Sequence, residues 1–414
     1  MTPPAPAPVA IRDPVDGLLT PEAVRTRCGE ILQVGVDGGL PWFDVELSKL
    51  ADATSRVVAE IEANYPDLNV PFHSRWRHFE LGGTDLWADM AAAHGLNGDD
   101  LAVAAGDLAI VSVLLDAGAG PDWIYDDDAT GLRLGRSEGL ALASLRLFGS
   151  GILSDDDASP LRADASALSA LSAETLGRVF QVADANPLVG LEQRAGLLRK
   201  LGETIAKHPS FYARGDAVRP GNLLPALASR TDLQARDILI ALLTTLMDIW
   251  PSPVRIEGRP LGDAGRHDAL VRDDKTDGIV PFHKLSQWLS YSLIEPLQQL
   301  GAPVSGLDGL TGLAEYRNGG LFVDTGVLTL KDLSAVAQAH APASELIVEW
   351  RALTVALLDR LASDVRATLN KSAEELPLAS ILQGGTWSAG RRIAAELRPD
   401  GGPPIRLDSD ATVF

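Results

Sequence analysis

The amino-acid sequence predicts a mostly α-helical protein with at most short β segments. Apolar residues recur at steps of three and four over long stretches, which is the spacing of one helix face. Residue pairs typical of helix starts precede several of these stretches. The apolar–polar alternation of half-buried strands is scarce along the 414 residues. Together these observations indicate helices packed against helices.

The predicted helices follow from these signals in chain order. Thr20 followed by Pro21 is typical of an N-cap and a first helical residue, and it opens a helix to about residue 33. Other helical segments are expected at 47–65, 161–184, 237–250 and 344–369, with further starts at Asn186-Pro187 and Thr231-Asp232. The strand candidates are 320–330 and 404–414, and the expected long loops are 207–222 and 251–278.

One large domain is expected between two extended ends. Residues 1–12 are rich in proline and predict a flexible tail, whereas 396–414 predict an extended C-terminal segment. Between them, 13–395 read as a single large α-helical catalytic domain. The 46% share of hydrophobic residues supplies enough apolar surface for a core of that size.

The overall charge and the single cysteine narrow the function classes. A formal net charge of −20 repels nucleic acid and anionic lipid, so neither is an expected partner. Cys28 alone cannot form an internal disulfide or a cysteine metal site. The N-terminus lacks the basic and apolar regions of a signal peptide, and the apolar segment 237–250 is too short to span a membrane. A cytoplasmic protein is expected.

Common cofactor and metal motifs are missing from the sequence. It contains no dinucleotide or Walker phosphate-binding glycine motif and no HExxH, and its seven histidines have no cysteine partners for zinc. Neither a cofactor nor a metal is therefore expected. GRSEG at 135–139 does match the GxSxG nucleophile elbow and keeps a serine hydrolase open. That elbow needs a preceding strand in a parallel sheet.

The residues Val-Pro-Phe-His occur twice, at 70–73 and at 280–283. Their flanks differ, which argues against a duplicated repeat. Proline at the first helical position would leave the next backbone N–H groups free, and a helix N-terminus attracts anions. Both stretches are therefore candidate anion sites, and solvated helix starts with an ordinary buried histidine are the alternative. The cationic side chains there are His73, Arg75, Arg77 and His78 in the first stretch and His283 and Lys284 in the second.

Two polar stretches in the first half of the chain have the composition of a site. Asp116 follows an apolar helix and precedes Ala-Gly-Ala-Gly, where glycines permit close ligand approach, although it is also suited to organising the turn. Trp123 either stacks on a ligand or fills the core. Ser137 and Glu138 lie at a predicted helix start, where the acid would stabilise the helix without any ligand.

Two more such stretches occur in the second half. Lys284 and Gln287 fall on one face of an otherwise apolar predicted helix, which indicates either a cleft or a solvated stripe. Glu315, Tyr316 and Arg317 precede Asn-Gly-Gly, a turn signal, within an apolar context. A buried Glu–Arg pair that only stabilises the fold is the alternative there.

Five of these stretches together resemble the uracil-catabolism protein family, long filed as a domain of unknown function. The likeness covers about residues 15–400. It implies a place in the pathway that opens the pyrimidine ring after conversion to the nucleotide. The stretches are PFHSRWRHF, SVLLDAGAGPDW, RSEGLALASL, PFHKLSQWLSYSLIEPL and LAEYRNGGLFVDTGVL.

A fainter resemblance links the C-terminal half to the queuosine salvage protein, which cleaves the N-glycosidic bond of a nucleoside 5′-phosphate. Its Phe-Tyr-Lys-x-x-Gln pattern is matched by Phe282, His283, Lys284 and Gln287. Its Phe-Ala-Asp-Tyr-Arg pattern is matched by Leu313, Ala314, Glu315, Tyr316 and Arg317. The Leu-Gly-x-Leu, Glu-x-Arg and Asp-to-Trp patterns are matched by Thr325 to Leu328, by Glu349 with Arg351, and by Asp116 with Trp123.

The resemblance implies a fold related to DNA glycosylases and the queuosine salvage protein. Two departures bear on the chemistry. Glu315 stands where that family has Asp, so the carboxylate reaches one methylene further, and His283 stands where it has Tyr. These departures put the sugar-linked group and the detailed role of the carboxylate in doubt.

The two resemblances together imply a metal-independent N-glycosidase that releases urea from a ribosylurea 5-phosphate. Glu315 would stabilise or attack the oxocarbenium-like carbon, as carboxylates do in glycoside hydrolysis. Asp116 would activate water or hold the ribose hydroxyls, with Glu138 as a weaker candidate, and Lys284 would assist the leaving urea. The cations available for the phosphate are Arg317, Arg75, Arg77, His73 and His283.

Two other readings of the same sequence stay open. The protein could be an amidohydrolase acting on the opened ureido product, and Ser137 of GRSEG would then belong to that chemistry. It could instead be a non-catalytic scaffold or sensor for a pathway enzyme. A homo-oligomer also stays open, since the sequence does not set the oligomeric state.

Overall fold

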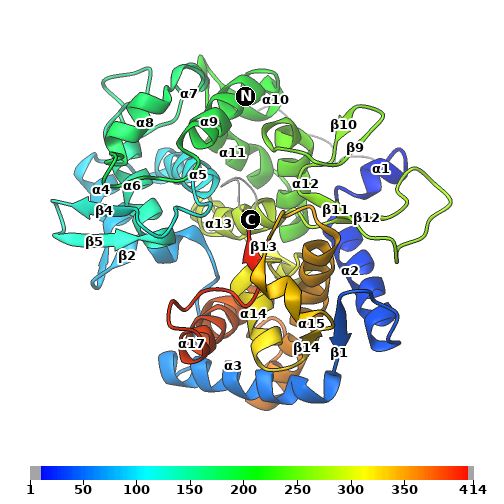
Figure 1. The fold of residues 1–414 in the computed structure, drawn as a ribbon. Coiled ribbons are helices and arrows are strands. Elements are labelled where there is room, and N and C mark those ends of the chain that lie inside the picture. The colour runs from blue at the N-terminus through cyan, green and yellow to red at the C-terminus, as the bar shows by residue number, and fades with distance from the viewer. Residues whose placement is uncertain (1–10, 409–414) are drawn as a thin grey trace.

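The computed structural model describes residues 11–408 and shows a mostly helical protein with short strand pairs (Figure 1). The helices of the N-terminal half are α1 (Pro14–Gly17), α2 (Pro21–Val36), α3 (Leu50–Asn64), α4 (Leu86–Ala93), α5 (Gly98–Leu114), α6 (Arg136–Gly149), α7 (Ala165–Ala170), α8 (Ala173–Val179) and α9 (Leu191–Ala206). Those of the C-terminal half are α10 (Pro209–Tyr212), α11 (Leu223–Ala228), α12 (Ala235–Leu246), α13 (Lys284–Gln299), α14 (Tyr316–Asp324), α15 (Glu345–Leu369), α16 (Leu378–Ile381) and α17 (Trp387–Leu397). The predicted mostly α class is confirmed.

The strands are short and form isolated pairs. Antiparallel pairs join β1 (Phe43–Val45) to β14 (Leu328–Leu330), β2 (Glu80–Leu81) to β3 (Thr84–Asp85), β4 (Ile124–Asp127) to β5 (Leu132–Gly135), β6 (Ala213–Arg214) to β7 (Ala217–Val218), β9 (Arg255–Ile256) to β10 (Arg259–Pro260), and β11 (Ala264–Arg266) to β12 (Ile279–Pro281). Parallel pairs join β8 (Leu233–Gln234) to β13 (Val304–Ser305) and β15 (Ala339–His340) to β16 (Arg406–Leu407).

Helices from distant parts of the chain pack into two groups that meet at α13 (Figure 1). In the lower group of the view, α2 and α3 from the N-terminal end pack on α15, and α14 packs on α17 near the C-terminal end. In the upper group α5 contacts α6 and α9. The helix α13 packs on α5 from the N-terminal half of the chain and on α12 from the C-terminal half. Along 11–408 no helix is both long and apolar enough to cross a membrane.

Two predicted helices are confirmed with their starts. The Thr20 hydroxyl accepts the N–H of Ala23, and α2 begins at Pro21, although it continues to Val36 rather than 33. The long segment predicted at 344–369 is α15, with Ser344 as its N-cap. The 47–65 segment is a 3₁₀ turn followed by α3.

Other local predictions are wrong. The 161–184 segment splits into the short helices α7 and α8. Helices do not begin at Asn186-Pro187 or Thr231-Asp232: α9 starts at Leu191 after a left-handed Gly190, and α12 starts at Ala235, where Gln234 and Asp237 form a capping box. Of the strand predicted at 320–330, residues 320–324 form the end of α14, which packs on α15 and α17, and only 328–330 pair with β1. The 404–414 strand is reduced to β16, and 409–414 lie outside the described residues.

The two Val-Pro-Phe-His stretches do not place proline at the first helical position. The first leads into a 3₁₀ helix, η2 (Arg75–His78), which starts four residues after Pro71. In the second, Pro281 belongs to β12 and α13 begins at Lys284 after a left-handed His283. The N–H groups of Phe282 and His283 donate to the Asp263 carbonyl, so they are not available to an anion.

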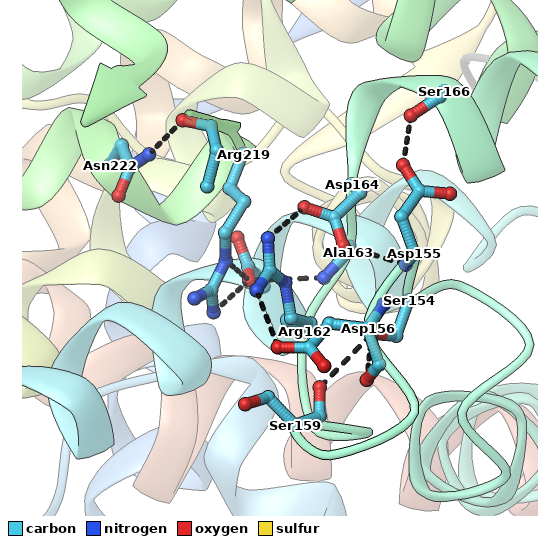
Figure 2. A network of polar contacts seen from close by, with 12 residues as sticks. Ser154, Asp155, Asp156, Ser159, Arg162, Ala163, Asp164, Ser166, Arg219 and Asn222 are labelled. Carbon is cyan, nitrogen blue, oxygen red and sulfur yellow. Dashed lines mark hydrogen bonds and ion pairs between the residues drawn. The ribbon is translucent and has the colours of Figure 1, made fainter. Parts of the chain in front are cut away.

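A polar network anchors α5 to the loop before α7 and to the turn before α11. Asp107, fully buried in α5, accepts the N–H groups of Ala163 (3.1 Å) and Gly221 (2.6 Å) and two N–H groups of Arg219. Figure 2 shows Arg219 beside Arg162, which pairs with Asp164. Each oxygen of the Asp107 carboxylate therefore has protein partners, and this network serves the fold.

Candidate functional site

Arg75 and Asp116 form a buried ion pair at the C-terminal end of α5. Arg75 opens η2 and is fully buried, and Asp116 follows the last turn of α5. Arg75 Nη1 lies 3.1 Å from Asp116 Oδ1, and Arg75 Nε donates to Ser112 Oγ at 2.7 Å. Ser137 Oγ donates to Asp116 Oδ2 at 3.2 Å. Three residues predicted from separate stretches, Arg75, Asp116 and Ser137, are thus in direct contact.

Trp288 of α13 covers this ion pair. The Arg75 guanidinium lies 5.6 Å from the Trp288 ring centroid, within cation–π range. His73 stacks on the same ring and His78 contacts it edge-on, each with 6.0 Å between centroids. His73 is fixed through Nδ1 by Gln383 Oε1 at 2.9 Å. Burial, together with Arg75 and His73, lowers the pKa of His78 to about 3, so its imidazole is neutral at physiological pH.

Several polar atoms in this cluster are buried without a hydrogen-bond partner among the described residues. They are Arg75 Nη2, His78 Nδ1, Trp288 Nε1 and Asp116 Oδ1, the last of which faces Arg75 only as an ion pair. Native proteins satisfy the great majority of such atoms, and exceptions are commonly explained by a bound water or ion or by a functional role. The cluster is therefore a candidate binding site.

Glu315 lies at the N-terminus of α14 as its N-cap. Its carboxylate accepts the N–H of Arg317 at 2.8 Å and that of Asn318 at 2.6 Å. Burial raises the pKa of Glu315 despite these bonds. Each carboxylate oxygen accepts one bond here and retains a lone pair for a second partner, so capping does not exhaust the group.

Lys284 connects the two acids. It is the first residue of α13, and its backbone N–H donates to Asp263 Oδ2 at 2.9 Å. Burial and the nearby Arg351 lower its pKa, while Glu315, Asp263 and Asp116 oppose that shift. Glu315 and Asp116, 199 positions apart in the sequence by subtraction, therefore both lie within electrostatic range of one cation. This is the arrangement on which the predicted site depends.

Asp263 was missed by the sequence analysis, which treated 251–278 as loop. Its carboxylate pairs bidentately with Arg351, at 2.8 Å for both bonds, and the arginine also lies 4.1 Å over the Phe282 ring. Arg351 keeps the pKa of buried Asp263 low, against the effect of burial. A buried fork of this kind fixes the start of α13 and thereby the position of Lys284. The only sequence signal was an acid within a Gly-rich segment.

Several predicted site residues lie in the protein core with partners of their own. Glu349 accepts N–H groups of Trp42 and Phe43 and contacts His267 Nε2 at 2.8 Å. The Gln287 side-chain amide donates to Thr311 Oγ1 and accepts the Thr311 backbone N–H. The Trp123 indole N–H donates to the Phe180 carbonyl at 2.9 Å, and the rings of these two residues stack. Glu349, Gln287 and Trp123 thus hold segments together around the candidate site.

The remaining predicted residues lie at the margins of the cluster. His283 Nε2 contacts the Leu18 carbonyl at 3.0 Å. Arg77 pairs with Glu295 and Glu80. Arg317 donates to the Gly401 carbonyl at 2.8 Å and lies 5.0 Å over the Tyr316 ring.

Glu138 is within electrostatic range of Arg75 and His78, and Arg391 of α17 pairs with it at 3.3 Å. Ser137 does not have the surroundings of a nucleophile elbow, because the preceding β5 belongs to a two-stranded antiparallel hairpin. Its hydroxyl instead supports Asp116.

A π-helix, η7 (Leu382–Thr386), also supports the site, although no sequence signal predicted it. Gln383 holds His73, and the Thr386 hydroxyl donates to Asn318 Oδ1 at 2.8 Å, next to the Glu315 cap. Single π-turns inside helices occur frequently at functional sites. Trp288 was likewise missed, because one aromatic on an apolar helix face reads as core.

A hollow lies elsewhere on the described part of the molecule. It has a volume of about 340 Å³ and is lined by side chains that include Leu19, Phe211, Ile240 and Arg236. None of the predicted site residues lines it. We favour the Arg75–Asp116 cluster as the site because it gathers unpartnered buried polar atoms and two acids around one lysine.

Fold and site together define an α-helical protein with a buried acid–cation cluster where its two helix groups meet. A family model described as "protein of unknown function (DUF1688)" matches residues 17–414. Protein urg3 of Schizosaccharomyces pombe (strain 972 / ATCC 24843) is 41% identical over 406 residues, covering 96% of this chain and 98% of that protein. Uracil catabolism protein 4 of Lachancea kluyveri is 38% identical over 414 residues, covering 91% and 93%. The chain belongs to this family, which confirms the first resemblance drawn from the sequence.

Proposed function

We propose that the protein hydrolyses the N-glycosidic bond of a ribosylurea 5-phosphate-like intermediate of pyrimidine catabolism, releasing urea and ribose 5-phosphate. The pathway assignment is supported by the name of the relative from Lachancea kluyveri, a uracil catabolism protein. The chemical assignment is supported by the surroundings of buried Lys284 at the start of α13, where Glu315 and Asp116 both favour its charged form and so oppose the lowering of its pKa. Carboxylates around one cation suit a reaction in which positive charge develops on a sugar carbon.

In the proposed reaction the bond between ribose C1 and the urea nitrogen breaks, and its electron pair stays on nitrogen. Glu315, ionised, stabilises the positive charge that develops at C1. The Lys284 ammonium donates a proton to the leaving nitrogen, so that urea departs as a neutral molecule. A water oxygen then bonds to C1, and the proton that it loses returns to the Lys284 amine.

The phosphate requires cations that are not neutralised by an internal acid. Arg75 is paired with Asp116, and Arg77 with Glu295 and Glu80, so we assign the phosphate to the Glu315 side. Arg317 lies there, and Arg136, an exposed residue with a left-handed backbone, is within electrostatic range of Tyr316 beside it. Arginine suits phosphate because its planar fork makes two parallel bonds.

The test is product analysis with ribosylurea 5-phosphate and the purified protein. Free urea with ribose 5-phosphate supports the proposal. An intact ribosyl product that carries a new carboxylate would identify an amidohydrolase, and tight binding without turnover would identify a scaffold or sensor. Either result would refute the glycosidase.

Glu315→Gln tests the assigned role within that assay. We expect kcat to fall about 10²–10⁴-fold, the usual range for a positioned catalytic group. Glu62→Gln makes the same change at an exposed position of α3 and should leave kcat unaltered. A Glu315→Gln protein that folds and turns over at the normal rate would remove Glu315 from the mechanism.

A further inference from the structure

The Arg75–Asp116 pair carries a donor and an acceptor that the described protein leaves unused. Arg75 has five N–H groups in a planar fork. Nε serves Ser112 and Nη1 serves the Ser137 carbonyl and Asp116, but Nη2 has no hydrogen-bond partner. Asp116 Oδ2 accepts from Ser137, whereas Oδ1 is held only by the ion pair with Arg75 Nη1 at 3.1 Å. One donor nitrogen without a hydrogen-bond partner and one carboxylate oxygen held only by the ion pair therefore belong to the same buried pair.

A neighbouring arginine shows that the fold can satisfy a buried guanidinium completely. Arg194 of α9 is fully buried and donates through Nε, Nη1 and Nη2 to the carbonyls of Val189, Leu115, Ala117 and Gly118. These carbonyls belong in part to the turn that carries Asp116, so Arg194 holds that turn in place. Leaving a buried polar group unpaired costs about 1–3 kcal/mol. Arg75 therefore differs from its neighbour Arg194 in having a nitrogen without a hydrogen-bond partner.

The chemistry of the open pair selects a neutral, planar ligand. The two charges cancel, and Asp116 would repel a phosphate or carboxylate placed against it. A ureido group has a carbonyl oxygen beside an N–H, so it can accept from Arg75 Nη2 while it donates to Asp116 Oδ1. The Trp288 indole N–H, also without a partner, adds a second donor beside the arginine.

We propose that Arg75, Asp116 and Trp288 form a recognition subsite for the ureido group of the substrate. This proposal rests on the proposed function and adds an orientation to it. The urea end lies against the ion pair, the sugar carbon lies against Glu315, and Lys284 faces the nitrogen between them. The role of Asp116 is then to bind the leaving group, and water activation falls to another group.

Binding measurements on Asp116→Asn test this assignment, because a ureido and a phosphate subsite respond with opposite signs. The measurements use a Glu315→Gln background to stop turnover, with ribosylurea 5-phosphate and ribose 5-phosphate as probes. A ureido subsite predicts that ribosylurea 5-phosphate binds about 5- to 150-fold more weakly, the equivalent of about 1–3 kcal/mol. Ribose 5-phosphate should bind within about twofold of its starting affinity, since it lacks the ureido group.

Two results would contradict the ureido subsite. If Asp116→Asn tightens ribose 5-phosphate or inorganic phosphate, the arginine is a phosphate ligand and the proposal fails. Trp288→Phe should weaken only ribosylurea 5-phosphate, and equal weakening of both probes would also overturn the subsite. Arg146→Lys is the matched control, because it alters an Arg–Asp pair in which both carboxylate oxygens of Asp127 accept a bond from Arg146. Neither residue of this pair belongs to the candidate site. Thermal unfolding of each variant confirms that a folded protein is being measured.

The test separates failure of the subsite from failure of the proposed function. In one case the wild-type protein does not hydrolyse ribosylurea 5-phosphate, while Asp116→Asn still weakens the binding of this compound more than that of ribose 5-phosphate. That result would refute the glycosidase activity and support the ureido subsite. If hydrolysis occurs and the two probes respond alike to Asp116→Asn, the subsite falls and the glycosidase stands.

Discussion

The two acids of the α5 segment have opposite surroundings. Asp107, inside the helix, receives hydrogen bonds from Ala163, Gly221 and Arg219, and both of its oxygens are used. Asp116, just beyond the helix end, has one oxygen bonded to Ser137 and the other facing an arginine that itself has an open nitrogen. Both acids are buried and both are paired with arginine, so burial and pairing do not distinguish them. What differs is whether the protein completes the hydrogen bonds.

The difference separates a structural charge from a candidate functional one. The Asp107 carboxylate, with both oxygens bonded, fixes the helix, the loop and the turn that it joins. A buried polar group that lacks a hydrogen bond lowers the free energy of unfolding, and a bound ligand can supply the missing bond. The comparison therefore predicts that changes at Asp107 act on stability, whereas changes around Asp116 act on binding and rate.

The largest expected effect is the loss of stability in Asp107→Asn. The substitution leaves Arg219 charged and partly buried without its counter-ion, and breaking a buried pair in this way costs about 3–5 kcal/mol. Chemical denaturation measures it as a lower free energy of unfolding. The kinetic constants of the folded fraction should not change.

Asp164→Asn is the neighbouring comparison, because Asp164 accepts from Arg162 and from the Asp155 N–H in the same network. It should lower stability in the same direction without any change in activity. Loss of turnover in a stable Asp107→Asn protein would contradict the distinction between Asp107 as a structural acid and Asp116 as a functional acid.

An intermediate effect is expected at Lys284, and its signature is the pH profile. Activity needs ionised Glu315, whose pKa is raised by burial, so the rate falls at low pH earlier than for an ordinary glutamate. It also needs protonated Lys284, whose pKa is lowered by burial and by Arg351, so the rate falls at high pH earlier than for an ordinary lysine. The bell-shaped profile is narrowed from both sides.

Lys284→Met should remove the alkaline limb and move the acid limb to higher pH. The reason is that the Lys284 charge lowers the pKa of Glu315, and this effect is lost. We expect kcat to fall by about 10²-fold. Asp107→Asn serves as the control and should keep the wild-type profile. An unchanged acid limb in Lys284→Met would show that the two groups do not interact.

The smallest effect is expected at Trp123, which follows Asp116 in sequence but whose indole N–H has a hydrogen-bond partner within the protein. Trp123→Phe removes the bond to the Phe180 carbonyl and should cost about 1 kcal/mol of stability. The affinity for ribosylurea 5-phosphate should stay the same. Weaker binding in this variant would return Trp123 to the site as a stacking residue.

Local signals in the sequence predicted the elements that form for local reasons. The hydroxyl of Thr20 and the ring of Pro21 act within one turn, so the start of α2 could be read directly. The prediction failed where contacts distant in sequence decide. Residues 320–324 have the composition of a strand, yet they form the end of α14 because they pack on helices that lie elsewhere in the chain.

The sequence predicted which polar residues could form the candidate site, but not which residues they would contact. Arg75, Asp116, Ser137, Lys284 and Glu315 all stood out as polar residues in apolar surroundings, and the structure brings them into one region. Their supporting residues did not stand out. A buried acid such as Asp263 and an aromatic such as Trp288 look ordinary until their partners are known.

The sequence by itself determined the helical class, the family and the polar residue types from which a site can be built. These properties reside in periodicity and in short motifs, which act over a few residues. Only the tertiary structure decided which acid was completed by the protein and which was left open. That distinction depends on hydrogen bonds between segments far apart in the chain, and no local pattern encodes whether the last bond is made.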